Sequence, residues 1–222
     1  MDAQHWDERY SSRDQLFSGN PNGVLVTEAA DLLPGRALDV GCGEGADALW
    51  LAGRGWQVTA VDISQVALDR AAAAAATTAT ATPTVTNAGT PTGTPTTADL
   101  SRRVTWQQAD VTSTPPPGGP FDLVSLQYFP LPIRPDHAAL RRLLAAVAPG
   151  GTLLMGSHDP ADHAVYRHPD FDPADYYGPD DVARLLGEDW TIETNESRLR
   201  TTAPPEGTHH VHDTVLRARR SL

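Results

Sequence analysis

Lysine is absent from this sequence, and cysteine occurs once, as Cys42. A single cysteine cannot form a disulfide within the chain, and such sparse cysteine favours a cytoplasmic protein. There is no run of about 18 apolar residues, so we expect no membrane-spanning helix. The first residues, MDAQHWDERYSSRD, are polar and charged, which argues against a signal peptide.

Positive charge is scarce as well. The 17 basic residues are all arginine and stand against 28 acidic residues, which gives a formal net charge of −11. A chain this acidic repels the phosphates of nucleic acids, so we expect no nucleic acid as partner. Without a long apolar run, we expect no membrane as partner either. The short basic run Arg217, Arg219 and Arg220 is interpreted as the solvated end of a strand.

The order of apolar segments predicts the fold class. At 222 residues the chain fits a single domain, with residues 1–34 as a helical leader. Strands and helical patterns alternate, which predicts an α/β fold with a mostly parallel sheet and helices on both faces. Strands are expected at 37–40, 58–63, 103–110, 121–127 and 152–157, followed by a closing antiparallel pair at 190–200 and 209–219. Helices are expected at 2–10, 23–33, 45–54, from Ser64 into Ala71–Ala76, at 138–148 and at 178–187, with Asn22 and Ser64 as N-caps.

A low-complexity insert at residues 77–101 interrupts this alternation. Eleven of the twenty-one residues from Thr77 to Thr97 are threonine, and most of the rest are Ala, Pro and Gly. The insert is either a loop or, from its alternation TATATPTVT, a strand of a short hairpin. It joins a helix to the next strand, so it should lie at the N-terminal edge of the sheet, away from the ligand-binding carboxyl edge.

The stretch LDVGCGEGADAL admits two kinds of cofactor. Gly41, Gly43 and Ala46 fit the G-x-G-x-x-G/A pattern of dinucleotide sites, whereas Gly41, Gly43 and Gly45 give G-x-G-x-G behind an acid. A pyrophosphate at the helix N-terminus would be repelled by Asp39 and Glu44. A cationic cofactor would be attracted instead, by roughly 4 kcal/mol for unit charges about 4 Å apart at an effective dielectric of about 20. The acids therefore disfavour a nicotinamide-dependent oxidoreductase.

Together these features resemble class I S-adenosylmethionine-dependent methyltransferases. The resemblance rests on LDVGCGEG, the acid of VTAVDIS, QQAD, FDLVSLQYF and the PGG turn before TLLMGS, and it runs from about Gly35 onward without the insert. It implies a Rossmann-like sheet of seven strands in the order 3-2-1-4-5-7-6 with the last strand antiparallel. It also implies S-adenosylmethionine as cofactor, S-adenosylhomocysteine as product and a small molecule as methyl acceptor.

The resemblance also assigns roles to residues. Asp39 would hold the methionine amino group, Asp62 the ribose hydroxyls and Asp110 the adenine amino group. Other cofactor-lining residues would be Gly41, Cys42, Gly43, Gly45, Ile63, Val111 and Gln127. Alternatively, Asp62 and Asp110 are solvated strand ends. Cys42 is interpreted as a small packed residue of the loop and not as a nucleophile.

The leader WDERYSSRDQLFSGNPN is similar to that of the tellurite-resistance and thiopurine methyltransferases. Trp6 and Tyr10 share a helix face and would either form part of a lid over the substrate or pack the helix on the sheet. Tyr128 and Phe129 begin an apolar loop suited to an aromatic acceptor, or else pack at the sheet edge. His158, after the fifth strand, is the candidate base, with an exposed loop histidine as the alternative.

Histidines gather near the C-terminal end of the sequence, in THHVHD. His210 and His212 should face one side of a strand, where they could line the acceptor pocket, bind a metal with His163 and His168, or occupy the strand face without a function. We expect no metal centre, because three histidines including His209 do not define a site. A non-catalytic sensor of the cofactor or of a metal is the alternative to an enzyme.

Overall fold

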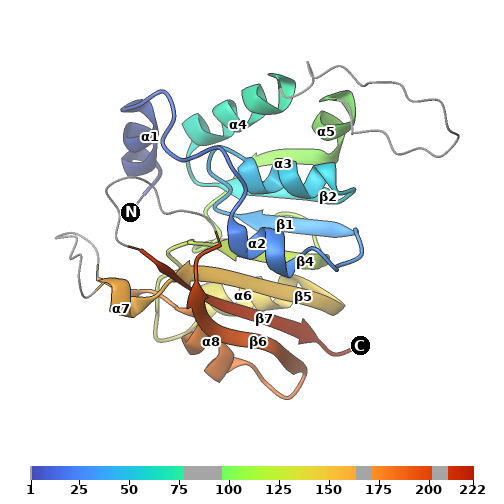
Figure 1. Cartoon of the computed structure of the whole chain (residues 1–222), viewed down its shortest axis with the longest axis vertical. Coiled ribbons are helices and arrows are strands. Elements are labelled where there is room, and N and C mark those ends of the chain that lie inside the picture. The colour runs from blue at the N-terminus through green and yellow to red at the C-terminus, as the bar shows by residue number, and fades with distance from the viewer. Residues whose placement is uncertain (1, 78–96, 164–171, 202–209) are drawn as a thin grey trace, which may run out of the picture.

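The computed structural model describes residues 2–77, 97–163, 172–201 and 210–222, which form one seven-stranded sheet with helices on both faces (Figure 1). The strands are β1 (Arg36–Val40), β2 (Gln57–Asp62), β3 (Val104–Gln108), β4 (Phe121–Gln127), β5 (Val147–His158), β6 (Trp190–Leu199) and β7 (His212–Arg220). The helices are α1 (Ala3–Ser11), α2 (Gly23–Glu28), α3 (Ala46–Gly53), α4 (Gln65–Thr77), α5 (Thr97–Arg103), α6 (Ala138–Ala146), α7 (Pro160–His163) and α8 (Pro179–Leu185), with a 3-10 turn at Pro173–Asp175. In the described ranges, no helix has the length and apolar character needed to cross a bilayer.

The order of the strands is β3-β2-β1-β4-β5-β7-β6. Strands β1 to β5 pair in parallel, whereas β7 runs antiparallel between β5 and β6. The predicted fold class and strand order are therefore confirmed. The carboxyl ends of the five parallel strands meet at one edge, where open α/β sheets bind ligands. Because β7 is antiparallel, its N-terminal end lies at that same edge, and α1 lies beyond the strand ends there (Figure 1).

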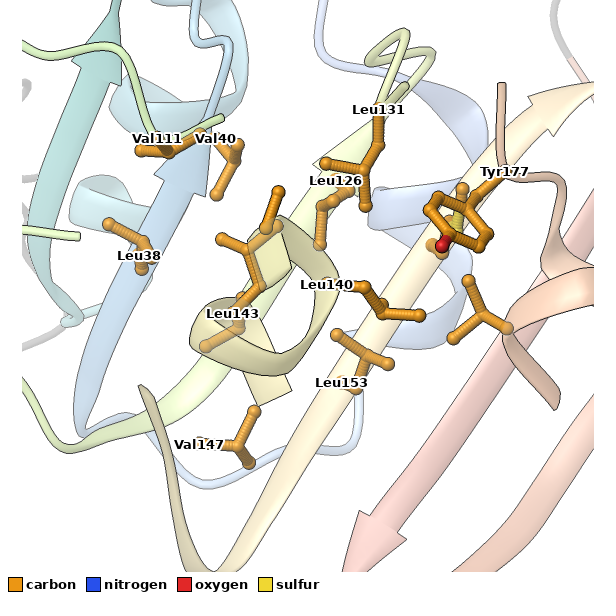
Figure 2. Close-up of a cluster of buried hydrophobic side chains, with 14 of the residues drawn as sticks. Leu38, Val40, Val111, Leu126, Leu131, Leu140, Leu143, Val147, Leu153 and Tyr177 are labelled. Carbon is orange, nitrogen blue, oxygen red and sulfur yellow. The ribbon is translucent and has the colours of Figure 1, made fainter. Parts of the chain in front are cut away.

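Alternate side chains on the central strands separate two apolar layers. Leu38 and Val40 of β1 belong to the layer under α6, into which Leu143 of that helix projects (Figure 2). Ala37 lies in the other layer, which α2 and α3 cover. Because side chains along a strand alternate between the two faces, Asp39 shares the α2 and α3 face with Ala37. The alternation thus places a carboxylate, not an apolar group, next to the turn after β1.

The start of β5 differs from the expectation. The sequence predicted a break at Pro149-Gly150-Gly151 and a strand from 152, but β5 begins at Val147. Val147 is fully buried and pairs with Phe121, and the register shifts between Phe121 and Leu123. The Pro-Gly-Gly segment is accommodated inside the strand as an irregularity because Val147 already packs into the core.

Two helices also differ from their expected bounds. Residues 97–101, predicted to belong to the insert, are helical in α5, where Leu100 is buried and packs with the α3 layer. Helix α2 ends at Glu28 instead of reaching residue 33. The rest of the insert, 78–96, lies outside the described residues, so the two interpretations of it stay open.

Candidate functional site

A turn of three glycines connects β1 to α3. Gly41, Gly43 and Gly45 all have positive φ angles, of 69°, 51° and 86°. The amides of Gly41 and Cys42 donate to the Val61 carbonyl at 2.8 and 3.0 Å, which fixes the turn against β2. Residues that carry a Cβ atom rarely adopt such φ angles, so the backbone conformation of this turn favours glycine. The turn exposes the N-terminus of α3 toward the carboxyl edge of the sheet.

Aromatic side chains lie directly over the glycine turn. A Cβ atom at position 41 would lie 2.5 Å from the Phe129 ring, and one at position 43 would lie 2.8 Å from the Tyr10 hydroxyl. Tyr10 is the buried residue of α1, and its ring lies 6.1 Å from that of Phe17. Trp6 packs against Tyr10, with the ring centroids 6.1 Å apart. The leader therefore brings Tyr10, but not Trp6, to the glycine turn.

Glu44 holds the leader in this position. Its carboxylate accepts hydrogen bonds from the amides of Leu16 and Phe17 at 3.0 to 3.2 Å and pairs with Arg70 at 3.1 Å. Arg70 also donates to the carbonyl of Arg13 at 2.6 Å. The carboxylate of Glu44 is therefore already paired with Arg70 and with two amides of the leader, and its effect on a cofactor charge stays a prediction.

Asp62, at the end of β2, is tied to the glycine turn. Its carboxylate accepts the amides of Gly43 and Ser64, both at 2.9 Å, and the residue is 7% exposed. Burial raises its pKa, and the amide hydrogen bonds only partly offset that effect. Ser64 caps α4 as predicted, because its hydroxyl accepts the amide of Ala67 at 3.1 Å. The acid thus lies next to the glycine turn.

Asp39 is the most deeply buried acid of the site, with 2% exposure. It accepts a hydrogen bond from the Ala48 amide, while its Oδ2 has no hydrogen-bond partner among the described residues. Burial raises its pKa well above the ordinary value, and the nearby acids Asp47 and Asp62 raise it further. A buried carboxylate oxygen without a donor is unfavourable, so this oxygen fits a cationic group that supplies N–H donors.

Asp47, in the first turn of α3, is a residue that sequence analysis missed. It accepts the backbone amide of Asn22 at 2.7 Å and the side-chain amide of Asn22 at 2.8 Å. The sequence predicted Asn22 as the N-cap of α2, but its side chain makes no capping hydrogen bond there and binds Asp47 of α3 instead. Burial raises the pKa of Asp47, so three acids of raised pKa surround the turn.

Asp110 lies just beyond the end of β3. Its Oδ1 accepts the amide and hydroxyl of Thr112 at 2.9 and 2.6 Å, and its Oδ2 accepts the Ser113 hydroxyl at 2.6 Å. Burial acts to raise the pKa of Asp110, but these hydrogen bonds outweigh it and lower the pKa. Val111 is buried beside Val40 in the layer of Figure 2. The carboxylate of Asp110 thus stabilises the turn that follows it. Ile63 comes directly after β2, and its carbonyl accepts a hydrogen bond from the Gln108 side chain.

The strand register aligns polar residues on one face of the sheet. Asp39 pairs with Ser125 of β4, Gln127 pairs with Gly156 of β5, and His158 pairs with Asp213 of β7. Because directly paired residues share a face and side chains alternate, all of these side chains lie on the face that α2 and α3 cover. The register therefore links the cofactor-side acid to His158 by one polar row that ends at the carboxyl edge.

Gln127 lies in the middle of this row and is 8% exposed. Its Nε2 donates to the Ser125 hydroxyl at 3.1 Å, whereas its Oε1 lacks a hydrogen-bond partner among the described residues. A Cβ on Gly156 would lie 2.5 Å from that Oε1, so glycine provides the space for the amide. Gln127 thus presents a second buried acceptor atom near Asp39.

A compact cluster completes the row at its far end. The Tyr128 hydroxyl donates to Asp213 at 2.8 Å, and Arg200 donates to the same carboxylate at 3.0 Å. Arg200 also contacts Nδ1 of His158 at 3.2 Å, and the His158 ring stacks on His210 with centroids 4.0 Å apart. The structure brings the predicted residues Tyr128, His158 and His210 together. It adds Arg200 and Asp213, which sequence analysis missed.

The Arg200 contact restricts the chemistry of His158. A guanidinium only donates hydrogen bonds, so Nδ1 of His158 must accept and the proton of the neutral ring lies on Nε2. A role as base, as the sequence suggested, therefore requires Arg200 to release Nδ1. Tyr128 has a left-handed backbone φ of 54°, and its ring centroid lies 4.5 Å from that of His158.

The two histidines predicted near the C-terminal end, His210 and His212, have different contacts. His212 contacts Asp162 through Nδ1 at 3.2 Å, whereas His210 precedes β7 and stacks on His158. The expectation that the two histidines share a strand face is therefore wrong, because the strand begins only at His212. Within the described ranges no three His, Cys, Asp or Glu side chains form a possible metal site. His168 and His209 lie outside the described residues.

Similarity to known proteins agrees with this geometry. The chain is 26% identical over 160 residues to a 27-O-demethylrifamycin SV methyltransferase from Amycolatopsis mediterranei. The aligned region spans 68% of this chain but only 48% of that methyltransferase. The chain thus covers about half the length of this curated relative.

Solved structures match over nearly the whole chain. A structure described as the conversion of a disulfide bond into a thioacetal group during echinomycin biosynthesis has a TM-score of 0.67 at 23% identity, covering 99% of this chain and 91% of that one. The N-methyltransferase NodS from Bradyrhizobium japonicum, in complex with S-adenosylhomocysteine, has a TM-score of 0.66 at 18% identity and covers 99% of both chains. At such identities these matches establish the fold.

The family follows from a model that describes a methyltransferase domain and matches residues 15–206. The predicted cofactor, S-adenosylmethionine, agrees with this family and with the product-bound neighbour. The narrower resemblance to tellurite-resistance and thiopurine enzymes stays a prediction. With its sheet order and glycine turn, the chain belongs to the methyltransferase domain family, as the resemblance to class I enzymes predicted.

Proposed function

We propose that the protein transfers a methyl group from S-adenosylmethionine to a small-molecule acceptor. The observation that carries this proposal is the buried Oδ2 of Asp39, which lacks a donor among the described residues and lies at the glycine turn. An ammonium supplies both the missing N–H donors and the opposite charge. A pyrophosphate supplies neither, which separates this proposal from a nicotinamide-dependent enzyme.

Each cofactor-side residue has a proposed task. Asp39 holds the methionine ammonium, Asp62 accepts the ribose hydroxyls and Asp110 accepts the adenine amino group. Gly41, Cys42, Gly43, Gly45, Ile63, Val111 and Gln127 line the remainder. The bound cofactor supplies a methyl carbon already activated by its sulfonium. The protein must then mainly position the acceptor and exclude water.

The acceptor side is proposed at the far end of the polar row. Tyr128, His158 and His210 supply ring surfaces and polar atoms there, while Phe129 and Tyr10 border the glycine turn and Trp6 packs on Tyr10. His212, which contacts Asp162, remains a proposed pocket residue. His158 is the proposed base if Arg200 releases its Nδ1. A cytoplasmic setting, which the single cysteine favours, is part of the same proposal.

Calorimetry with S-adenosylhomocysteine tests cofactor binding directly. We expect one site per chain, and no heat of binding with either the cofactor or its product would refute the proposal. Catalysis is then tested by incubating the protein and S-adenosylmethionine with a panel of small acceptors and measuring S-adenosylhomocysteine. Tight binding without turnover on any acceptor would support a sensor instead of an enzyme.

A further inference from the structure

Arg200 follows β6 and is buried at the end of the polar row, with a side chain that is 10% exposed. Its Nη1 makes both of its polar contacts, to Asp213 at 3.0 Å and to Nδ1 of His158 at 3.2 Å. Its Nε is buried and has no hydrogen-bond partner among the described residues. The hydrogen bonds of the described chain likewise leave Nη2 unused. One side of the guanidinium is therefore fixed to the protein and the other side is not.

The unused side has a defined shape. In a guanidinium, the Nε–H and one Nη2–H point in the same direction and form a fork, which matches the two oxygens of a carboxylate. A buried N–H without an acceptor is unfavourable, so the fork calls for an oxygen ligand. Asp213 does not supply that ligand, because it already binds Nη1 and accepts from Tyr128.

Charge and ring contacts narrow the chemistry of this ligand. The chain carries a net charge of −11, so its overall field repels anions and a local cation must provide the attraction. Arg200 lies 5.3 Å from the centroid of the Tyr128 ring, and Tyr128, His158 and His210 follow one another with ring centroids 4.5 and 4.0 Å apart. The guanidinium that would hold the ligand thus lies against the Tyr128 ring, and a ring at this position favours an aromatic partner.

We propose that the Nε and Nη2 fork of Arg200 binds a carboxylate of the methyl acceptor, so that the protein acts on aromatic acids. This inference rests on the proposed methyl transfer and specifies its substrate class. Arg200 is then a residue that determines specificity, and Asp213 and His158 hold its guanidinium in place. Methyl transfer itself is unchanged by the proposal.

The test compares matched acids and amides on the protein saturated with S-adenosylhomocysteine. Benzoate, 4-hydroxybenzoate and 3,4-dihydroxybenzoate are each paired with the corresponding benzamide, and the affinities are measured by calorimetry. We expect the acids to bind at least about tenfold more tightly than the amides. Equal affinities, a preference for the amides or no binding of any acid would overturn the inference.

Variants locate the effect. Arg200→Gln should remove the preference for acids, so that each acid binds no more tightly than its amide, and Arg200→Lys should retain only part of the preference, because lysine has no fork. Arg184→Gln removes the same charge from a side chain that is 69% exposed and should leave the preference intact. An acid preference that survives Arg200→Gln would also overturn the inference. If Arg200→Gln does not fold, Arg200→Lys and the comparison on the unaltered protein decide.

The two proposals fail separately in this design. Absence of S-adenosylhomocysteine binding refutes the proposed function before any acid is added. Binding of S-adenosylhomocysteine without a preference for acids refutes only the role of Arg200.

Discussion

The Tyr10 hydroxyl lies 2.8 Å from the point that a Cβ atom of residue 43 would occupy. Tyr10 comes from the first helix and Gly43 from the turn after β1, so the leader reaches the backbone that should cradle the cofactor. Burial raises the pKa of Tyr10, and the neighbouring Asp62 carboxylate raises it further, so this hydroxyl stays protonated at neutral pH. The contact makes the leader part of the proposed cofactor site.

The first prediction concerns Gly43→Ala. The φ of 51° costs an alanine about 1–2 kcal/mol, and the contact with Tyr10 adds to that cost. We expect lower stability in thermal melts and weaker binding of S-adenosylhomocysteine. Tyr10→Phe in the same chain should recover part of both losses, since it removes the contacting oxygen. The control is Gly53→Ala, where the nearest atom to a new Cβ lies at 3.9 Å; a loss as large there would contradict the assignment.

The second prediction separates binding from stability at Asp39. Its folded pKa lies above the unfolded value, so its stabilising contribution is fully present below the unfolded pKa and is lost as pH rises through the folded one. At neutral pH Asp39→Asn should therefore raise the melting temperature of the ligand-free protein. The same change should weaken S-adenosylhomocysteine binding at least about tenfold, because the charge that attracts the ammonium is gone. Asp189→Asn, at a side chain that is 58% exposed, should change neither property.

The third prediction is the pH dependence of cofactor binding. Burial raises the pKa values of Asp39, Asp47 and Asp62, and a cationic ligand favours their ionised forms. Affinity should therefore rise with pH through the raised pKa values of these acids, and binding should release protons. Calorimetry in buffers of different ionisation enthalpy measures that release. Proton uptake on binding, or an affinity that falls as pH rises over the same range, would exclude the carboxylates as the cation site.

The fourth prediction tests the attachment of the leader. Glu44→Gln removes the charge that pairs with Arg70 and weakens the hydrogen bonds from Leu16 and Phe17. Hydrogen exchange at these two amides should accelerate, while amides within the central sheet should keep their protection. S-adenosylhomocysteine should also dissociate faster, since a looser leader covers the turn less well. Unchanged exchange at both amides would show that Glu44 does not hold the leader.

The sequence specified the cofactor side of the fold better than the acceptor side. The turn at Gly41, Gly43 and Gly45 and the acids at the ends of β1 and β2 follow from local patterns, because strand periodicity and positive φ angles are encoded nearby. Asn22 was assigned the wrong partner and the contacts of Glu44 were not predicted, since these contacts lie 25 to 28 residues away in the chain. Local patterns do not indicate which of two polar neighbours a side chain will choose.

The acceptor-side cluster shows the same limit more strongly. Arg200 and Asp213 are 13 residues apart, and Asp213 meets Tyr128 across 85 residues. Their meeting depends on β7 entering the sheet antiparallel in one register, and a shift by one residue would turn Asp213 to the other face. No residue spacing in the sequence predicts that register, although the sequence analysis did identify the nearby histidines as candidate functional residues.

Because β7 is the last strand made but lies between β5 and β6, the cofactor half and the acceptor half of the proposed site form at different stages of synthesis. Strands β1, β2 and β3, with the glycine turn and Asp62, precede residue 110, so the cofactor half can assemble while later segments are still being made. Asp213 enters only when β7 inserts between β5 and β6, which were made before it. Until that insertion Arg200 and Tyr128 lack their shared carboxylate. A nascent chain should therefore acquire a cofactor-binding half before it can select an acceptor.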